Sequence, residues 1–313
     1  MASEHDEERG GWVARWWPFV ALCLVGASRW LLDDRWPDAG STLVSRSAGC
    51  GTAALLTLAA AAWSHRRGKS VGPEESVWRN AFGGLLMLGG PAVALILLPR
   101  DIDSGALMIA LSITPVAAGV ASVALGDAGE TLAGYLWPGL AAMAGMLLIL
   151  PQPSLADPTA DLAMVLAPVM TGVGAALLAH ESRRTDASGQ GSGAGSGAVA
   201  SLSAAALVFG AAALARYGFA EVRVSFTVPA AVLDGLVAWL AVATVRRLGA
   251  MRFSANSSLV PFVVLLEGLV LMRPTLTKRL EIGLILLLIA GTTLLVRGGD
   301  DPDDADPSML DLG

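Results

Sequence analysis

Charged residues are scarce in this chain. They make up 15% of its 313 residues, whereas soluble globular proteins are close to one quarter charged. Hydrophobic residues reach 54% and the mean hydropathy is +0.61. The few charges crowd into short segments between long runs of Ala, Leu, Val and Gly. This composition excludes an ordinary water-soluble fold, and it predicts a polytopic membrane protein surrounded by a lipid bilayer.

Basic residues are also sparse, and the net charge of −6 belongs to two tails. Residues 1–9 and 297–313 hold ten of the 27 acidic residues and two of the 21 basic ones. The body between them, with 17 acidic and 19 basic residues, is close to neutral. No basic patch indicates nucleic-acid binding. The acidic N-terminus lacks the positive region of a cleaved signal peptide, so we expect the first apolar run to be retained as a helix.

Cysteine and histidine are too few to indicate a metal or redox centre. Cys23 and Cys50 fall inside apolar runs, where cysteine usually serves as a small packing residue. The sequence also lacks a G-x-S-x-G elbow and a G-x-x-x-x-G-K phosphate loop. Glu74, Glu75 and Arg79 match the E-E-x-x-x-R motif of intramembrane proteases, but such enzymes need histidine ligands within their helices. We therefore expect no metal, no cofactor and no enzymatic activity.

Ten apolar runs are long enough to cross a bilayer, whose hydrocarbon core needs roughly 20 residues per helix. They lie near residues 12–32, 42–64, 79–98, 105–125, 131–150, 158–180, 198–215, 227–245, 256–272 and 279–296. Arg29 interrupts the first run, and the seventh is mostly Ala, Ser and Gly. The sequence therefore predicts an all-α polytopic membrane protein with ten transmembrane helices.

The segments between these runs predict the domain boundaries and the orientation. We expect an acidic tail over 1–11, five-helix units over 12–150 and 151–296, a Gly/Ser-rich loop at 181–197, and an acidic tail over 297–313. With ten spans both termini share one side, which holds 12 basic residues against eight on the other. Because basic residues favour the cytoplasmic side, we expect a cell (inner) membrane protein with both termini in the cytoplasm.

The two five-helix units are related by an internal repeat. An offset of 146 residues pairs Pro115 with Pro261 and gives seven identities over the 36 positions 115–150. The same offset carries spans one, three, four and five onto six, eight, nine and ten, and span two overlaps span seven apart from the Gly/Ser insertion. Because five is an odd number, the second copy enters the membrane from the opposite side. The pattern is that of an inverted-topology repeat, which is typical of secondary transporters.

The end of each unit resembles a known family. Residues 115–150 and 261–296 look like the closing two helices of each half in the drug/metabolite transporter superfamily, EamA type. That pattern is a Pro-led helix, a tight loop usually reading L-G-E-x-x-T, and a helix that ends in A/G-G-x-x-L-L. The resemblance implies a five-plus-five helix plan over essentially the whole chain, with the Pro-led helices lining a central cavity. Asp127, Arg273 and Pro274 depart from the family pattern in the two tight loops.

Three ionisable side chains inside the spans are candidate substrate- or ion-binding residues, because a charge within a membrane is costly. Glu267 lies near the middle of the ninth span, beside Gly268 and after Pro261. Its carboxylate would suit binding of a cationic group or exchange of a proton; the alternative is a structural carboxylate that accepts a hydrogen bond from a neighbouring helix. We expect Glu267→Gln to abolish pH-gradient-driven uptake without affecting membrane insertion. Unchanged pH-dependent uptake would remove Glu267 from the mechanism.

The other two candidates are Asp234 and Arg46. Asp234 lies in span eight beside Gly235, where a substrate or a neighbouring helix can approach the backbone closely. Its alternative role is to pair with Arg46 or with a hydroxyl across a helix interface. Arg46 lies one turn from the outer end of span two, where its stem can snorkel to the interface, and it matches the Arg that often opens that helix in the resembling family. The helix-flexing candidates are Pro115, Gly119, Pro261 and Gly268.

These features favour a secondary transporter that moves a small organic molecule by alternating access, either with or without proton coupling. The alternative is a non-transporting scaffold or assembly protein with a transporter-like fold, which the altered tight loops and the low-complexity insertion favour. An intramembrane enzyme is the least favoured class. The Ala- and Gly-rich helix surfaces fit a monomer and a dimer alike.

Overall fold

The computed structural model describes residues 2–31, 39–67, 76–97, 104–127, 131–150, 158–187, 194–224, 228–272 and 277–297. Within these residues the chain forms eleven α-helices and no β-strand, so the all-α class is confirmed. They are α1 (Ala2–Leu31), α2 (Ala39–Arg66), α3 (Val77–Leu97), α4 (Ser104–Leu111), α5 (Thr114–Ala124), α6 (Leu132–Ile149), α7 (Pro158–Ala187), α8 (Ala194–Val224), α9 (Val228–Ser254), α10 (Asn256–Met272) and α11 (Lys278–Arg297).

Each of the ten apolar runs coincides with a helix, except that the fourth is divided into α4 and α5. The division lies directly before Pro115, which is at the start of α5. Proline has no backbone N–H to donate to the preceding turn, so the helical hydrogen bonding is interrupted here. At this interruption the Ser112 hydroxyl donates a hydrogen bond to the Ile109 carbonyl oxygen at 2.6 Å. Pro261, in contrast, lies inside an uninterrupted α10.

Several helices extend beyond the predicted spans. α1 begins at Ala2, within the segment that the sequence places in the acidic tail. α7 and α8 take up all of the predicted loop at 181–197 except residues 188–193, which lie outside the described residues. Gly195 can continue α8 along α2 because it has no side chain: a β-carbon there would lie 2.7 Å from the Ala61 β-carbon. The C-terminal tail after residue 297 also lies outside the described residues.

Seven helical segments are long and apolar enough to cross a membrane, by length and composition, among the residues described. They are Thr42–Ser64, Leu107–Ala124, Leu132–Ile149, Asp161–Thr185, Gly195–Gly218, Val228–Ser254 and Lys278–Arg297. A shorter apolar stretch, Asn256–Val270, lies in α10. This abundance of long apolar helices indicates a membrane-embedded protein.

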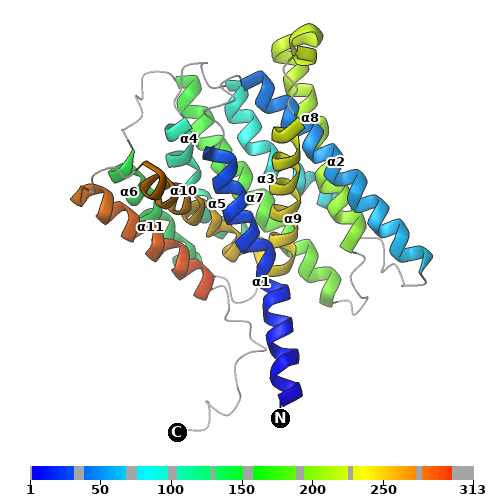
Figure 1. Ribbon diagram of the computed structural model, residues 1–313, viewed down its shortest axis with the longest axis horizontal. Coiled ribbons are helices and arrows are strands. Elements are labelled where there is room, and N and C mark those ends of the chain that lie inside the picture. The colour runs from blue at the N-terminus through cyan, green and yellow to red at the C-terminus, as the bar shows by residue number, and fades with distance from the viewer. Residues whose placement is uncertain are drawn as a thin grey trace.

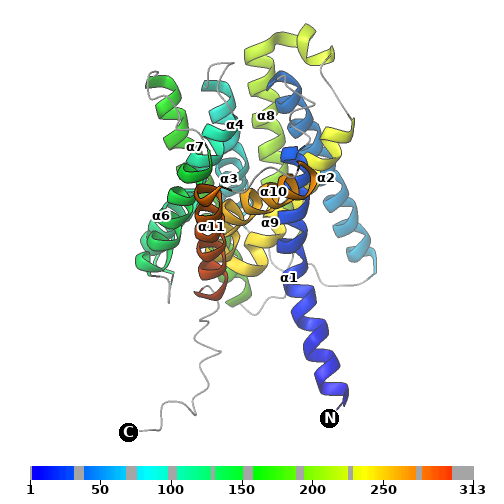
Figure 2. The ribbon, with the colours of Figure 1, turned by 60° about the vertical axis from the view of Figure 1, so that its left-hand side comes forward.

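The helices pack side by side, and α1 begins and α11 ends toward the same end of the bundle (Figures 1 and 2). We call this the terminal end and the other the opposite end. α2 packs on α8, and α6 packs on α11. α3 packs on α7 and α8, whereas α9 packs on α1 and α2. α5 lies against α6 and α7, and α10 lies against α1 and α11.

The passage from α9 to α10 differs from the predicted loop. Gly249 has a φ of 84°, a left-handed conformation that glycine adopts readily, and it turns the chain sharply. The residues that follow turn into the bundle, so Arg252 is only 8% exposed. Its Nε donates to the Leu295 carbonyl oxygen at 3.4 Å, and its Cζ lies 5.1 Å from the ring centroid of Trp16. Arg252 lies between the predicted spans 227–245 and 256–272, where the sequence predicts a basic connecting loop on the cytoplasmic side and gives no signal of burial.

Candidate functional site

A buried carboxylate joins three helices near the opposite end of the bundle. Asp234 is 6% exposed and lies six residues after the start of α9, about 9 Å along the helix. Arg29 of α1 donates from Nε to Asp234 Oδ1 at 2.8 Å. Ser45 of α2 donates from its hydroxyl to Asp234 Oδ2 at 2.5 Å. We call these three residues the Asp234 cluster.

Close approach of two glycines explains how Ser45 reaches Asp234. A β-carbon at Gly49 would lie 2.5 Å from the backbone nitrogen of Gly235, so α2 and α9 touch backbone to backbone. Ser45 is one turn before Gly49 on the same side of α2, and Asp234 directly precedes Gly235. The small residues therefore bring the hydroxyl and the carboxylate together, as glycine does in membrane helix interfaces generally.

The sequence left open whether Asp234 pairs with Arg46 or with a hydroxyl. The hydroxyl of Ser45 is one partner, and the guanidinium that reaches the carboxylate is that of Arg29. Arg46 instead places its Cζ 5.9 Å from the ring centroid of Phe209 on α8. The sequence signalled Arg29 only as a charge that interrupts the first span, because its spatial neighbours come from residues more than 200 positions away.

Glu267 lies apart from these residues. It is half-buried on α10, which packs on α1, α11 and α9, and no hydrogen bond or ion pair of Glu267 is found among the described residues. A β-carbon at the adjacent Gly268 would meet nothing within 4 Å, so this side of α10 is open. Among the described residues, no hydrogen bond or ion pair therefore links Glu267 to the Asp234 cluster or to Arg46.

The helix-flexing candidates are in different environments. Gly119 is buried, and a β-carbon there would lie 2.5 Å from Cγ of Tyr135, so glycine is required for α5 to pack against α6. Pro115 ends the hydrogen bonding between α4 and α5, as described above. Pro261 is buried within α10, and Gly268 borders open space.

A second polar cluster lies at the terminal end, where α5 ends. Asp127 follows Gly126, whose φ of 74° turns the chain toward α7. His180 Nδ1 lies 2.7 Å from Asp127 Oδ1, and Arg183 donates to Asp127 Oδ2 at 2.6 Å. The side chain of Asp127 is 5% exposed, although it belongs to a connecting segment. We call Asp127, His180 and Arg183 the Asp127 cluster.

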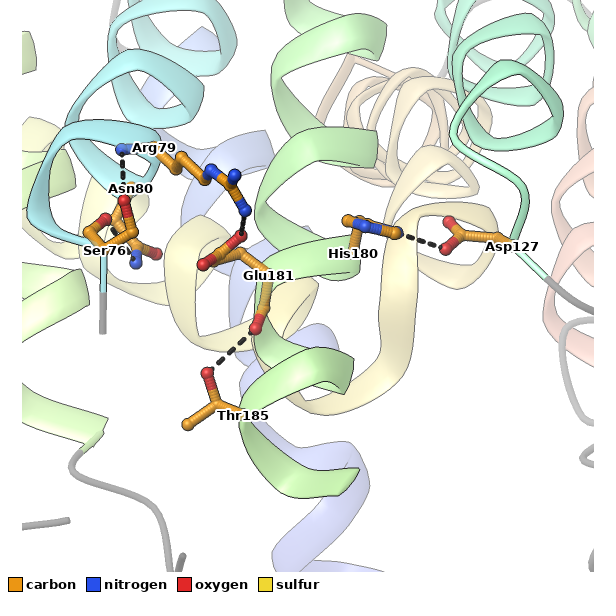
Figure 3. Close-up of polar contacts among 7 residues, drawn as sticks. All are labelled: Ser76, Arg79, Asn80, Asp127, His180, Glu181 and Thr185. Carbon is orange, nitrogen blue, oxygen red and sulfur yellow. Dashed lines mark hydrogen bonds and ion pairs between the residues drawn. The ribbon is translucent and has the colours of Figure 1, made fainter. Parts of the chain in front are cut away.

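Glu181, which follows His180 on α7, has its partner on the other side of the helix. Glu181 accepts a hydrogen bond from Arg79 of α3 at 3.3 Å, and Thr185 donates to the Glu181 carbonyl oxygen at 2.9 Å. Figure 3 shows His180 and Glu181 pointing in opposite directions, toward Asp127 and Arg79 respectively. The end of α7 is therefore held both by α3 and by the segment after α5. Asp127 occupies the altered tight loop, and that departure was the one sequence signal of this cluster.

Comparison with known proteins gives a fold but no family. No family model and no curated protein matches this chain. Fourteen chains of solved structures match it. One of them, described as "Crystal structure of protein", is 15% identical, covers 90% of this chain and 96% of its own length, and has a TM-score of 0.61. At this identity the likeness shows the fold alone.

Proposed function

We propose that this protein is a secondary transporter of the drug/metabolite type that moves a small organic solute across the cell membrane by alternating access. It would have ten transmembrane helices in two inverted five-helix repeats, with α4 and α5 counted as one, and both termini in the cytoplasm. The observation that carries this proposal is the pattern of helix packing. The Asp234 and Asp127 clusters, at opposite ends of the bundle, supply the closures that such a cycle requires.

Most of the closely packed helix pairs repeat when the first five helices are exchanged for the last five; α7 against α9 is an exception, because α1 and α3 do not pack in the corresponding way among the described residues. Under this exchange α3 against α7 becomes α9 against α1, and α3 against α8 becomes α9 against α2. Likewise α5 against α7 becomes α10 against α1, and α5 against α6 becomes α10 against α11. The pairs α2 with α8 and α6 with α11 map onto themselves. This correspondence supports two copies of one unit, and transporters of this construction bind solutes where the copies meet.

Two individual contacts support the same offset of 146 residues that the sequence suggested. A β-carbon at Gly172 of α7 would lie 2.8 Å from the Thr114 carbonyl oxygen of α5. A β-carbon at Gly26 of α1 would lie 3.3 Å from Cγ2 of Val260 in α10. Gly26 and Gly172 differ by 146 positions, and so do Thr114 and Val260. None of these four residues is among the 36 paired positions on which the identities were counted, although Thr114 and Val260 directly precede them. The contacts therefore support the offset separately from the identities.

Alternating access requires a closure at each end of the solute path, and the two must open in turn. The Asp234 cluster holds α1, α2 and α9 together near the opposite end. The Asp127 cluster holds the end of α7 at the terminal end. Glu267 has no described hydrogen bond or ion pair with either cluster, and we propose it for ion coupling, to be tested by the uptake measurement given above.

Reciprocal accessibility tests the cycle without a known solute. In a background of Cys23→Ala and Cys50→Ala, single cysteines are introduced by Val44→Cys, near the opposite end, or Leu125→Cys, near the terminal end. Both positions are half-buried against the same core. Asp127→Asn should free the end of α7, so we expect maleimide to react faster at position 125 and more slowly at position 44.

The control for this test is Thr185→Val, which removes a hydrogen bond within α7 at the same end but leaves the Asp127 cluster intact. It should change neither reaction rate. If Asp127→Asn speeds the reaction at position 125 with no decrease at position 44, the two ends are uncoupled, and the chain is then a scaffold rather than a transporter.

A further inference from the structure

Arg46 is a charged residue that neither polar cluster uses. It lies seven residues after the start of α2, which places its α-carbon about 10 Å along the helix. Its guanidinium lies over the ring of Phe209, which is 3% exposed and belongs to the largest buried core. The side chain is half-buried, and its guanidinium lies at the interface between α2 and α8.

α2 and α8 run antiparallel along this interface. Ser47 donates from its hydroxyl to the Ala206 carbonyl oxygen at 2.9 Å, while Gly195, earlier in α8, packs on Ala61, later in α2. Moving toward the start of α2 therefore means moving toward the end of α8. The start of α2 and the end of α8 both lie at the opposite end of the bundle (Figure 1).

A second arginine lies on the same face of α8. Arg216 follows Phe209 by seven residues, which is two helical turns, and its Cζ lies 6.0 Å from the ring centroid of Tyr217. Side chains lean toward the start of their own helix. Because α2 and α8 are antiparallel, the Arg46 side chain leans toward the opposite end of the bundle and the Arg216 side chain leans away from it, so the lean of each reduces their separation along the helices. Two positively charged side chains therefore lie along the α2–α8 interface toward the opposite end of the bundle.

Asp234, the buried carboxylate near the opposite end of the bundle, already has hydrogen-bond partners. Both oxygens of Asp234 accept hydrogen bonds, one from Arg29 and one from Ser45. An arginine within a membrane helix costs up to about 2.5–3.5 kcal/mol at the centre, whereas stacking of a guanidinium on an aromatic ring returns about 0.5–2 kcal/mol. Basic residues are also disfavoured on the side away from the cytoplasm, where the proposed topology places Arg46.

We propose that Arg46 binds the acidic group of an organic anion, a carboxylate or a phosphate ester that also carries an apolar or aromatic part. The inference rests on the proposed transport function, because it names the class of solute carried. Phe209 contacts the flat face of the Arg46 guanidinium. The N–H groups lie at the edge of the guanidinium, where they can donate hydrogen bonds to a ligand. Those N–H groups match two oxygens of one oxyanion, and Phe209 and Tyr217 offer apolar contact for the rest of the molecule.

The test uses four probes with one aromatic skeleton: benzoate, phenyl phosphate, benzamide and benzylamine. Thermal unfolding of the purified full-length protein is measured with each probe at millimolar concentration, because a ligand that binds the folded state raises the melting temperature. We expect benzoate or phenyl phosphate to stabilise the protein. Comparing the two melting temperatures shows whether the site prefers a carboxylate or a phosphate ester. Benzamide and benzylamine should have no effect.

Three variants assign the site. Arg46→Gln should abolish the stabilisation, and Arg46→Lys, which retains the charge, should weaken binding at least about tenfold because the paired N–H donors are lost. Arg67→Gln is the matched control: Arg67 directly follows the same helix and its Cζ lies 4.9 Å from the ring centroid of Trp63, but at the terminal end. It should bind the anions as the unaltered protein does. Arg46→Lys keeps the test valid if Arg46→Gln does not fold.

The inference is overturned if benzylamine is the stabilising probe, if neither anion stabilises the protein, or if Arg46→Gln and Arg46→Lys retain full anion affinity. Counterflow of labelled benzoate or phenyl phosphate in proteoliposomes separates this inference from transport itself. Anion binding through Arg46 without flux would uphold the anion site and reject the transporter. Flux of benzylamine that does not depend on Arg46 would uphold the transporter and reject the anion site.

Discussion

Asp234 and Asp127 each contact two partner side chains, but the partners lie in different surroundings. Around Asp234 the side chains are almost dry: Arg29 is 8% exposed and the carboxylate 4%. Asp127 is as buried, at 5%, yet His180 is 28% exposed and Arg183 is 43% exposed. Because hydrated partners can exchange a protein contact for water at little cost, the second cluster can open more easily than the first.

The two clusters also differ in what they join. Asp234 ties α9 to α1 and α2, so three helices must move if it opens. Asp127 binds two residues three positions apart on α7, which lie on one face of a single helix. A connecting segment and one helix end can separate with fewer other changes. In the proposed transport cycle the Asp234 cluster would therefore be the firmer closure, and the Asp127 cluster would open first.

The largest effect should come from breaking the Asp234 cluster. Asp234→Asn keeps the size of the side chain but leaves the Arg29 guanidinium without its carboxylate in a nearly dry interior. Removing one member of a buried pair costs about 3–5 kcal/mol, because the remaining charge is uncompensated. We expect a loss of stability of that size, measured by unfolding in mixed detergent micelles, together with poor expression.

The double variant Arg29→Met, Asp234→Leu separates this charge effect from loss of packing. It removes both charges and retains apolar volume, and such replacements are often neutral or stabilising. We expect the double variant to recover most of the stability that Asp234→Asn loses. A double variant as unstable as the single one would mean that shape, and not charge compensation, makes Asp234 necessary.

The sequence predicted the helices well and the contacts of the charges poorly. Apolar runs are a local signal, so each run coincides with helical residues. Seven of the described helical segments are long and apolar enough to cross a membrane. Asp234 was identifiable because a carboxylate within an apolar run is rare. Its partner Arg29 was not, since the pairing depends on how α1 is placed against α9. Arg252 was misplaced in a loop for a similar reason: the turn at Gly249 decides its burial.

Residues at the terminal end show the same limit. His180 and Arg183 read as the ordinary basic end of a span, and Asp127 reads as a deviation in a tight loop. Their contact depends on the left-handed conformation of Gly126 and on the register of α7, which continues past the predicted end of its span. Local periodicity contains no information about either. A pairing of this kind is recoverable only once the tertiary arrangement is known.

A smaller effect should come from breaking the Asp127 cluster. Asp127→Asn removes the charge that holds Arg183, but Arg183 and His180 are partly exposed and can be solvated by water. Hydrogen bonds to charged groups are worth about 1.5–3 kcal/mol when buried, and exposed ion pairs about 0–1 kcal/mol. We expect a loss of about 1–2 kcal/mol in the same unfolding assay, with Thr185→Val as the control that loses less. Hydrogen exchange should rise at the end of α7 and remain unchanged around Asp234. A loss equal to that of Asp234→Asn would show that both ends are fixed, and the distinction between a firm and a yielding closure would then be wrong.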